Sequence, residues 1–233
     1  MRYGEIIELG RHKLMCGDAT SREDVMRLAD GLKVDLVLTD PPYGIRVMGK
    51  DSTGTIGKSN CYKSVIGDNN SEMAREHYHI ARTISNRQII WGGQNFTEFL
   101  PPSCGWIFWD KDKGTDKLSF SDGELAYANV LTKIKKYTHK WNGMVRARDS
   151  KLNHKIHPTQ KPVELHMKIL EDFSKPGDVI LDCFGGSGTT LIACEMTGRK
   201  CLMMEISPEY SEIIKARYEK LTEGKLPLEA ANA

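Results

Sequence analysis

Short apolar runs alternate along this chain with longer stretches in which apolar residues recur every three or four positions. The short runs suit buried strands, and the longer stretches suit amphipathic helices. The predicted strands cover residues 12–16, 34–39, 88–91, 106–109, 124–128, 178–182 and 200–204. The predicted helices cover residues 21–31, 71–85, 163–174, 189–197 and 208–221. This alternation predicts an α/β fold whose mostly parallel sheet carries helices on both faces.

Two stretches carry neither pattern. Residues 44–70 are rich in Gly, Ser, Asn and Thr, which indicates a long loop. Loops of that length are uncommon in compact domains unless they are functional or mobile, and this one directly follows a candidate site, so we expect a mobile catalytic-site loop. Residues 224–233 form an expected frayed tail.

Length and composition favour one soluble domain. The 233 residues are 39% hydrophobic and 27% charged, as in a protein that buries a sizeable core. Apolar runs do not reach the 18 residues of a membrane span, so no membrane association is expected. The six cysteines show no C-x-x-C pair, which favours a reducing cytoplasm and no metal site.

Charge is unevenly distributed. The whole chain has a net charge of +2, whereas residues 129–156 contain eight basic side chains and the single acid Asp149. The basic residues are Lys133, Lys135, Lys136, Lys140, Arg146, Arg148, Lys151 and Lys155, with Tyr137, His139, Trp141 and His154 interleaved. A solvated charged surface is the alternative. The scarcity of acids and the interleaved aromatic rings favour a small basic insert that recognises nucleic acid.

The tetrapeptide Asp40-Pro41-Pro42-Tyr43 follows the strand predicted at 34–39. Two prolines stiffen the backbone, the carboxylate accepts hydrogen bonds, and the tyrosine ring can stack on a flat ligand. These groups together suit a planar, amino-bearing ligand such as a nucleobase. The alternative is a turn that only closes the strand.

A glycine-rich turn at residues 181–190 follows another predicted strand and opens a helix. It lacks the Lys of a phosphate loop and the third Gly of the dinucleotide fingerprint. Glu205 nevertheless lies 20 residues past Gly185, where an acid can bind ribose hydroxyls. A ligand with a ribose and an anionic group fits, and S-adenosylmethionine is such a ligand, with Asp182 available for its amino group.

Three motifs in a fixed order now carry a resemblance. They are Asp40-Pro-Pro-Tyr43, His157-Pro-Thr-Gln-Lys-Pro162 and Asp182-Cys-Phe-Gly-Gly-Ser-Gly-Thr-Thr190, with Ser121-Asp-Gly-Glu-Leu-Ala126 in support. The chain resembles, over nearly all of residues 12–220, the DNA methyltransferases that methylate exocyclic amino groups. Its motif order is similar to that of the circularly permuted β class. Cys183 stands where many relatives have proline.

The resemblance implies a Rossmann-like, S-adenosylmethionine-dependent methyltransferase fold over residues 1–233, with a seven-stranded sheet in which one strand is antiparallel. It implies a catalytic set of Asp40, Pro41, Pro42 and Tyr43. It implies cofactor contacts from Asp18, Thr159, Lys161, Asp182, Phe184, Gly185, Gly186, Ser187, Gly188, Thr189 and Glu205. Expected DNA contacts are Arg46, Lys135, Lys136, Lys140, Arg146, Arg148 and Lys151.

The implied reaction is transfer of a methyl group to N6 of adenine in double-stranded DNA. Asp at position 40 favours adenine, because cytosine enzymes of this group more often have Ser there. N4 of cytosine is the first alternative, and a non-catalytic DNA- or cofactor-binding subunit is the second. RNA and protein methyltransferases generally place the cofactor loop first. A homodimer and a restriction-enzyme partner are both compatible with the resemblance.

Overall fold

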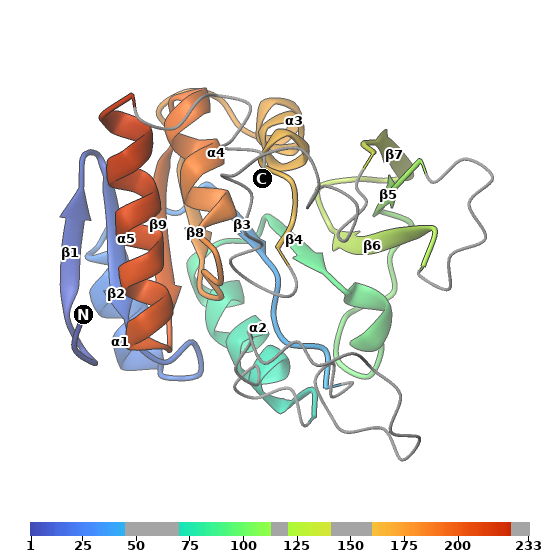
Figure 1. The fold of residues 1–233 in the computed structure, drawn as a ribbon. Helices are drawn as coiled ribbons and strands as arrows, with labels where there is room; N and C mark the ends of the chain where they lie inside the picture. Colours follow the sequence, from blue (N-terminus) through green and yellow to red (C-terminus); the bar gives the residue numbers. More distant parts are fainter. Residues whose placement is uncertain (45–69, 113–120, 141–159, 225–233) are drawn as a thin grey trace, which may run out of the picture.

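A single mixed β-sheet runs through the molecule and separates two layers of helices (Figure 1). This computed structural model describes residues 1–44, 70–112, 121–140 and 160–224. The strands are β1 (Ile6–Leu9), β2 (His12–Cys16), β3 (Leu36–Thr39), β4 (Gln88–Trp91), β5 (Trp106–Asp110), β6 (Gly123–Ala128), β7 (Ile134–Thr138), β8 (Val179–Asp182) and β9 (Lys200–Glu205). Their order across the sheet is β1-β2-β9-β8-β3-β4-β6-β5-β7.

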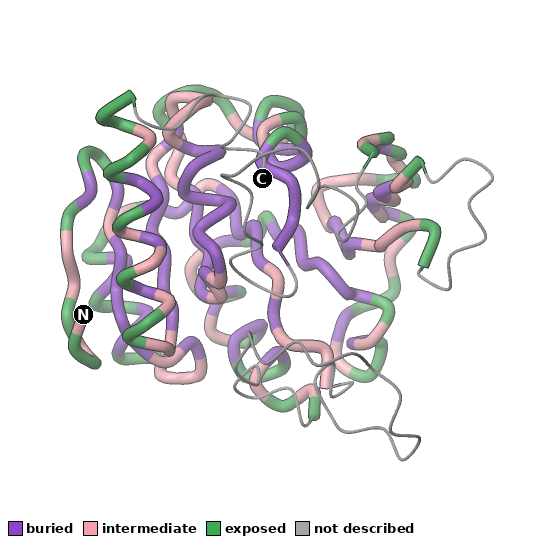
Figure 2. The backbone as a smooth tube through the Cα atoms, viewed as in Figure 1, coloured by how far each residue is buried: buried purple, intermediate pink, exposed green. Residues whose placement is uncertain are grey.

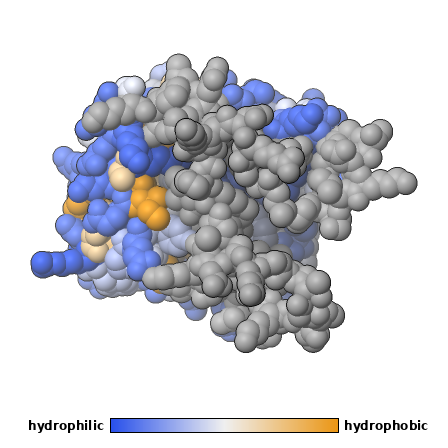
Figure 3. Space-filling view, in the orientation of Figure 1, coloured by the Kyte–Doolittle hydropathy of each residue, from blue (hydrophilic) through white to orange (hydrophobic). Residues whose placement is uncertain are grey.

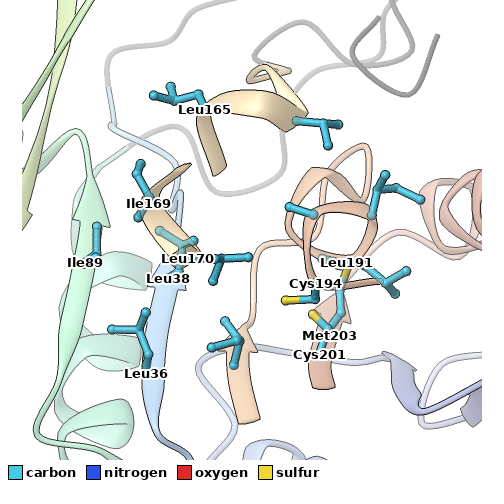
Figure 4. Packing of buried hydrophobic residues seen from close by; sticks show 14 of the residues in the cluster. Leu36, Leu38, Ile89, Leu165, Ile169, Leu170, Leu191, Cys194, Cys201 and Met203 are labelled. Carbon is cyan, nitrogen blue, oxygen red and sulfur yellow. The ribbon is translucent and has the colours of Figure 1, made fainter. Parts of the chain in front are cut away.

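Helices lie on both faces of this sheet, as the alternation of elements predicts. They are α1 (Arg22–Ala29), α2 (Glu72–Ile84), α3 (Val163–Phe173), α4 (Thr189–Thr197) and α5 (Pro208–Thr222), and the 3-10 turn η1 (Gly93–Asn95) follows β4. Leu36 and Leu38 pack in the cluster that includes α3, α4 and α5, whereas Val37 packs with α1 and α2. Figure 4 shows the first cluster from close by, and Figure 2 shows how its strands are buried.

Helix ends are set by local chemistry. The Ser21 hydroxyl accepts a hydrogen bond from the Asp24 amide and so begins α1, which ends at Asp30 in the left-handed region at φ 48°. Ser207 begins α5 in the same way, and Pro208 occupies its first turn. The predicted helices are therefore confirmed to within a few residues at each end.

The sheet is wider than expected. The prediction of seven strands is wrong for the described residues, because β1 and β7 add a strand at each edge. The seven strands between them include one antiparallel member, β6, which pairs with β4 and β5. β1 pairs antiparallel with β2, and β7 pairs parallel with β5. Both β1 and β7 are short edge strands in which apolar and polar residues are mixed. They form by pairing with β2 and β5, and the sequence pattern does not reveal that pairing.

Five parallel strands, β2, β9, β8, β3 and β4, deliver their carboxyl ends to one edge of the sheet. From β8 the chain continues on one side to β9, while β3 and β4 lie on the other. Ligands of open α/β sheets bind at such a switch point, outside the carboxyl ends of the strands. Asp40 follows β3, and the glycine-rich turn follows β8, so the fold brings both predicted sites to this place.

The described surface seen in Figure 3 is mainly hydrophilic. A helix apolar and long enough to cross a bilayer is not found among the described residues.

Candidate active site

Asp40 leaves the end of β3 with both carboxylate oxygens engaged. The Tyr43 hydroxyl donates to Oδ1 at 2.7 Å, and the Lys161 ammonium donates to Oδ2 at 2.5 Å. The Asp40 side chain keeps 19% of its surface exposed, so one side faces outward. The carboxylate has lone pairs beyond these two bonds, which an amino group could use.

Lys161 lies at the tetrapeptide that begins with Asp40. The resemblance groups it with the cofactor residues, but its ammonium contacts Asp40 and lies 3.3 Å from both the Tyr43 hydroxyl and the Glu124 carboxylate. Its side chain is only 4% exposed. Its backbone carbonyl accepts a bond from the Thr189 hydroxyl at 3.2 Å, so the residue joins the Asp40 site to the start of α4.

Opposite charges decide the protonation of this cluster. Burial lowers the pKa of Lys161, but the negative charges of Asp40 and Glu124 outweigh it and hold that pKa well above the usual value. Burial raises the pKa of Asp40, and the Lys161 charge opposes that rise. Burial also acts to raise the pKa of Glu124, yet Lys161 and Lys111 lower it overall. Lys161 is therefore cationic, and Glu124 is anionic.

The Tyr43 ring packs closely against Gly92. Gly92 follows β4 at φ 70°, and a Cβ there would lie 2.1 Å from the Tyr43 ring. The ring also makes an edge contact with Phe96, with centroids 6.2 Å apart. The tyrosine ring is thus held at the mouth of β4 with its hydroxyl on Asp40.

The glycine-rich turn after β8 is anchored by Glu205. The two Glu205 carboxylate oxygens accept bonds from the Gly186 and Ser207 amides at 2.8 and 2.9 Å. Gly188, at φ 82°, leads directly into α4, whose amino end favours anionic groups. Glu205 is therefore at the predicted place beside the loop, where it orders the backbone and keeps lone pairs for a hydroxyl.

Asp182 faces inward. Its oxygens accept bonds from Thr39 at 2.9 Å, from Thr190 at 2.6 Å and from the Phe184 amide at 3.1 Å. Burial raises its pKa to about 7. The expected contact between Asp182 and a cofactor amino group stays a prediction, whereas its link to Thr39 joins the two strands that carry the sites.

The remaining predicted cofactor residues surround the same loop. Asp18 follows β2 and accepts bonds from the Thr20 amide and hydroxyl, both at 2.8 Å. The Gly17 amide donates to the Glu205 carbonyl, which places Asp18 beside the end of β9. Phe184 meets the edge of buried His77 at 5.1 Å, and Arg217 donates to the Ser187 carbonyl at 2.9 Å.

These groups fit S-adenosylmethionine by their chemistry. Two acids at adjacent strand ends suit ribose hydroxyls, and the amino end of α4 suits a carboxylate. The Nε2 atom of His77 is buried beside Phe184 and has no hydrogen-bond partner among the residues that the structure describes. Thr159 lies outside the described residues.

The predicted DNA contacts divide at residue 140. Lys135 and Lys136 lie on the edge strand β7 and form ion pairs with Asp172 and Asp110 at 2.7 and 2.9 Å. The first part of the basic segment thus belongs to the sheet. Lys140 is exposed just beyond β7. The loop at 44–70 and the insert at 129–156 fall largely outside the described residues, as do Arg46, Arg146, Arg148 and Lys151.

Two charged residues of the site were missing from the sequence-based prediction. Glu124 begins β6 next to Gly123, and Lys111 follows β5 and contacts Glu124 at 2.7 Å. The motif Ser121-Asp-Gly-Glu124 was part of the resemblance, but it carried no assigned chemistry. The pairing of β5 and β6 sets Glu124 opposite Trp109, and only the folded chain shows that Glu124 lies 3.3 Å from Lys161.

Comparison with known proteins finds a family model and several relatives that are similar to this chain. Residues 106–216 match the family described as DNA methylase of the N6/N4 type. The chain is 27% identical to the type II methyltransferase M.HpaI of Haemophilus parainfluenzae, over 89% of this chain and 74% of that protein. It is 25% identical to M2.MboI of Moraxella bovis, over 81% and 82% of the two chains.

Solved structures share the fold. The complex of M1.HpyAVI with S-adenosylmethionine has a TM-score of 0.54 and 24% identity, and it covers 88% of this chain and 98% of its own. The PvuII DNA methyltransferase, which is specific for cytosine N4, has a TM-score of 0.58 and 15% identity, with 96% and 97% coverage. The resemblance to amino-methylating DNA methyltransferases and the Rossmann-like α/β fold are therefore confirmed, while the permuted β-class order stays a prediction.

Proposed function

We propose that this chain, which is similar to the amino-methylating (N6/N4) DNA methyltransferases, transfers a methyl group from S-adenosylmethionine to N6 of adenine in double-stranded DNA. The observation that carries the proposal is the Asp40 carboxylate, held by Tyr43 and Lys161 at the mouth of β3 and joined through Thr39 and Asp182 to the glycine-rich turn. An amino-group acceptor and a cofactor loop thus share one edge of the sheet.

The chemistry explains why a carboxylate is needed. The lone pair of an exocyclic amino nitrogen is delocalised into the aromatic ring, which makes the nitrogen a poor nucleophile. Asp40 and the Pro41 carbonyl accept its two N–H bonds, so the nitrogen becomes tetrahedral and its lone pair turns away from the ring. Tyr43 stacks on the base, and Pro42 keeps the tetrapeptide rigid.

The transfer is a direct displacement without a covalent enzyme intermediate. Bound S-adenosylmethionine supplies a methyl group on a positively charged sulfur. The amino nitrogen attacks the methyl carbon in line, the carbon–sulfur bond breaks, and its electron pair remains on sulfur. The nitrogen then loses one proton toward Asp40 and onward to water.

The cofactor contacts follow the loop geometry. Glu205 and Asp18 face the ribose and adenosine portion, and residues 184–188 wrap the methionine portion against the start of α4. Thr159, Asp182 and Thr189 complete the proposed set. Glu205 can accept a ribose hydroxyl while it holds Gly186 and Ser207, because each carboxylate oxygen accepts more than one bond.

The target base must leave the DNA helix before it can react. The amino nitrogen cannot be reached inside a duplex, so the base flips out of the stack toward Asp40 and Tyr43. Arg46, Lys135, Lys136, Lys140, Arg146, Arg148 and Lys151 contact phosphates, which makes the affinity fall steeply with salt. The small basic segment suits a short recognition site.

Adenine is proposed over cytosine on the identity of residue 40. Cytosine N4 is the second candidate, because both amino groups suit the same acceptor, and the PvuII enzyme shows that this fold also serves cytosine. One experiment separates them: incubation with labelled S-adenosylmethionine and duplex DNA, followed by digestion to nucleosides. N6-methyladenine supports the proposal, N4-methylcytosine reassigns the base, and label in RNA, in protein or nowhere overturns it.

A variant tests the division between the two sites. Asp40→Ala removes the amino-group acceptor but leaves the glycine-rich turn intact, so methyl transfer should be abolished while S-adenosylmethionine binding is nearly unchanged. Calorimetric titration with the cofactor measures the second property. If Asp40→Ala also loses cofactor affinity, the proposed division of roles is wrong.

A further inference from the structure

Four charged side chains form a continuous ionic chain that ends on the catalytic carboxylate. Lys111 contacts Glu124 at 2.7 Å, Glu124 contacts Lys161 at 3.3 Å, and Lys161 contacts Asp40 at 2.5 Å. The four residues come from four places in the sequence: the end of β5, the start of β6, the entry to α3 and the end of β3. The tertiary fold alone assembles this chain.

The centre of the chain is buried. The Lys161 side chain is 4% exposed, and its ammonium lies 5.1 Å from the Trp91 ring centroid and 5.9 Å from that of Tyr43. Removing charges from water is costly, and a buried ion pair often stabilises a protein less than an apolar side chain of the same size. The place of this pair, on the atom that must accept the amino group, points to a chemical reason for it.

We propose that Lys161 is a positioning residue, whose ammonium, held by Glu124, keeps the Asp40 carboxylate charged and in place to accept the amino group. This inference rests on the proposed function for its meaning in catalysis. Its physical content concerns the protein alone.

A carboxyl group accepts an N–H bond most strongly, and can take up a proton, only while it is ionised. Asp40 is largely buried, and burial favours the protonated form. The groups that face it are Lys161, Tyr43, Glu124 and, across the strand pair, Asp182. Of these, only Lys161 carries a positive charge, and therefore it is the group that opposes protonation.

Glu124 has a different effect on each neighbour. It attracts the Lys161 ammonium from the side opposite Asp40, and Lys111 in turn neutralises its other oxygen. Its own negative charge raises the pKa of Asp40. Loss of Lys161 and loss of Glu124 should therefore move the titration of Asp40 in opposite directions.

The test follows Asp40 directly in the cofactor-free protein. Carboxyl ¹³C NMR of protein labelled at aspartate, with Asp40→Asn to identify the signal, measures its titration midpoint. In Lys161→Met the midpoint should rise by about 1–3 pH units, the range by which a nearby opposite charge shifts an aspartate. Lys161→Arg keeps the charge and should keep the midpoint near that of the wild type.

Lys13→Met is the matched control. Lys13 is also a partly buried lysine in an ion pair, with Asp30 at 2.8 Å, but it lies on β2 and outside the site. Its loss should leave the Asp40 midpoint unchanged. In Glu124→Gln the midpoint should fall, and Lys161→Gln, with a neutral polar side chain, repeats the Lys161 test if Lys161→Met fails to fold.

Methyl transfer supplies the second readout. Lys161→Met should lose about tenfold in kcat for each pH unit by which its Asp40 midpoint exceeds the assay pH, and it should recover as the pH rises through that midpoint, where Asp40 ionises without help. An unmoved Asp40 midpoint overturns the inference, as does an equal loss of kcat at every pH. Because the titration uses neither DNA nor cofactor, it holds or fails independently of the proposed function.

Discussion

At the scale of single residues, the site depends on positions that carry no reactive group. Gly92 is one, because its missing side chain is the space that the Tyr43 ring occupies. Thr39 is another, since its hydroxyl binds Asp182 and so couples the end of β3 to the end of β8. The reactive residues are therefore positioned by small neighbours as much as by one another.

Gly92→Ala should lower kcat about 100-fold, since its new methyl group would displace the Tyr43 ring and the hydroxyl that holds Asp40. Steady-state methylation assays measure this loss. Gly31→Ala is the matched control, because Gly31 has the same φ of 70° and nothing within 4 Å of an added Cβ. Both variants should lose about 1 kcal/mol of stability from left-handed backbone strain. Equal activity in the two variants would contradict the proposed support of Tyr43.

At the scale of elements, buried polar side chains close the ends of helices. Arg199, between α4 and β9, donates to the Leu170 and Ser174 carbonyls near the end of α3 and to the Thr197 carbonyl at the end of α4. The last carbonyls of a helix have no partner within it, and a cation also favours the negative end of the helix dipole. The Arg199 guanidinium thus links the carboxyl ends of α3 and α4 next to the start of β9.

Arg199→Met should lower the free energy of unfolding by about 3–5 kcal/mol, because it leaves several buried carbonyls without donors. Urea unfolding measures the change. Arg199→Lys restores the charge but not the planar fork, so it should recover only part of the loss. Full recovery by lysine would mean that charge alone fastens the helices.

At the scale of the whole molecule, three buried groups link stability to pH. Burial lowers the pKa of His77 to about 4 and that of His166 to about 3, and it raises that of Asp182 to about 7. Below about pH 6.5 both histidines are protonated in the unfolded chain, whereas they stay neutral in the folded protein. The folded protein instead keeps one proton on Asp182, whose stabilising contribution is lost as pH rises through about 7.

Between about pH 6.5 and about pH 4.5 the unfolded state binds one proton more on these three groups than the folded state does. Together they should therefore lower the free energy of unfolding by about 1.4 kcal/mol for each pH unit of acidification. Asp182→Asn removes the opposing proton, and the total slope should steepen by the same amount. Urea unfolding at stepped pH measures both slopes. Glu171→Gln, which removes an exposed acid on α3, should leave the slope nearly unchanged. An unchanged slope in Asp182→Asn would show that Asp182 is already ionised at these pH values.

The sequence alone determined the α/β class, most element positions, and the two motifs that meet at the sheet edge. These are properties of local periodicity and of side chains that follow a strand, so they can be seen without a partner. It also named Asp40, Tyr43, Glu205 and the glycine-rich turn, which the structure brings to adjacent strand ends.

Only the tertiary structure decided what depends on pairing between distant segments. The edge strands β1 and β7 form because they hydrogen-bond to β2 and β5. Such pairing between separate segments cannot be deduced from the local sequence of either strand. Lys161 contacts Asp40 although 121 positions separate them in the chain, and Glu124 contacts Lys161 from β6. Electrostatic energy depends on distance in space and on burial, so the partners of a charge appear only when the chain is folded.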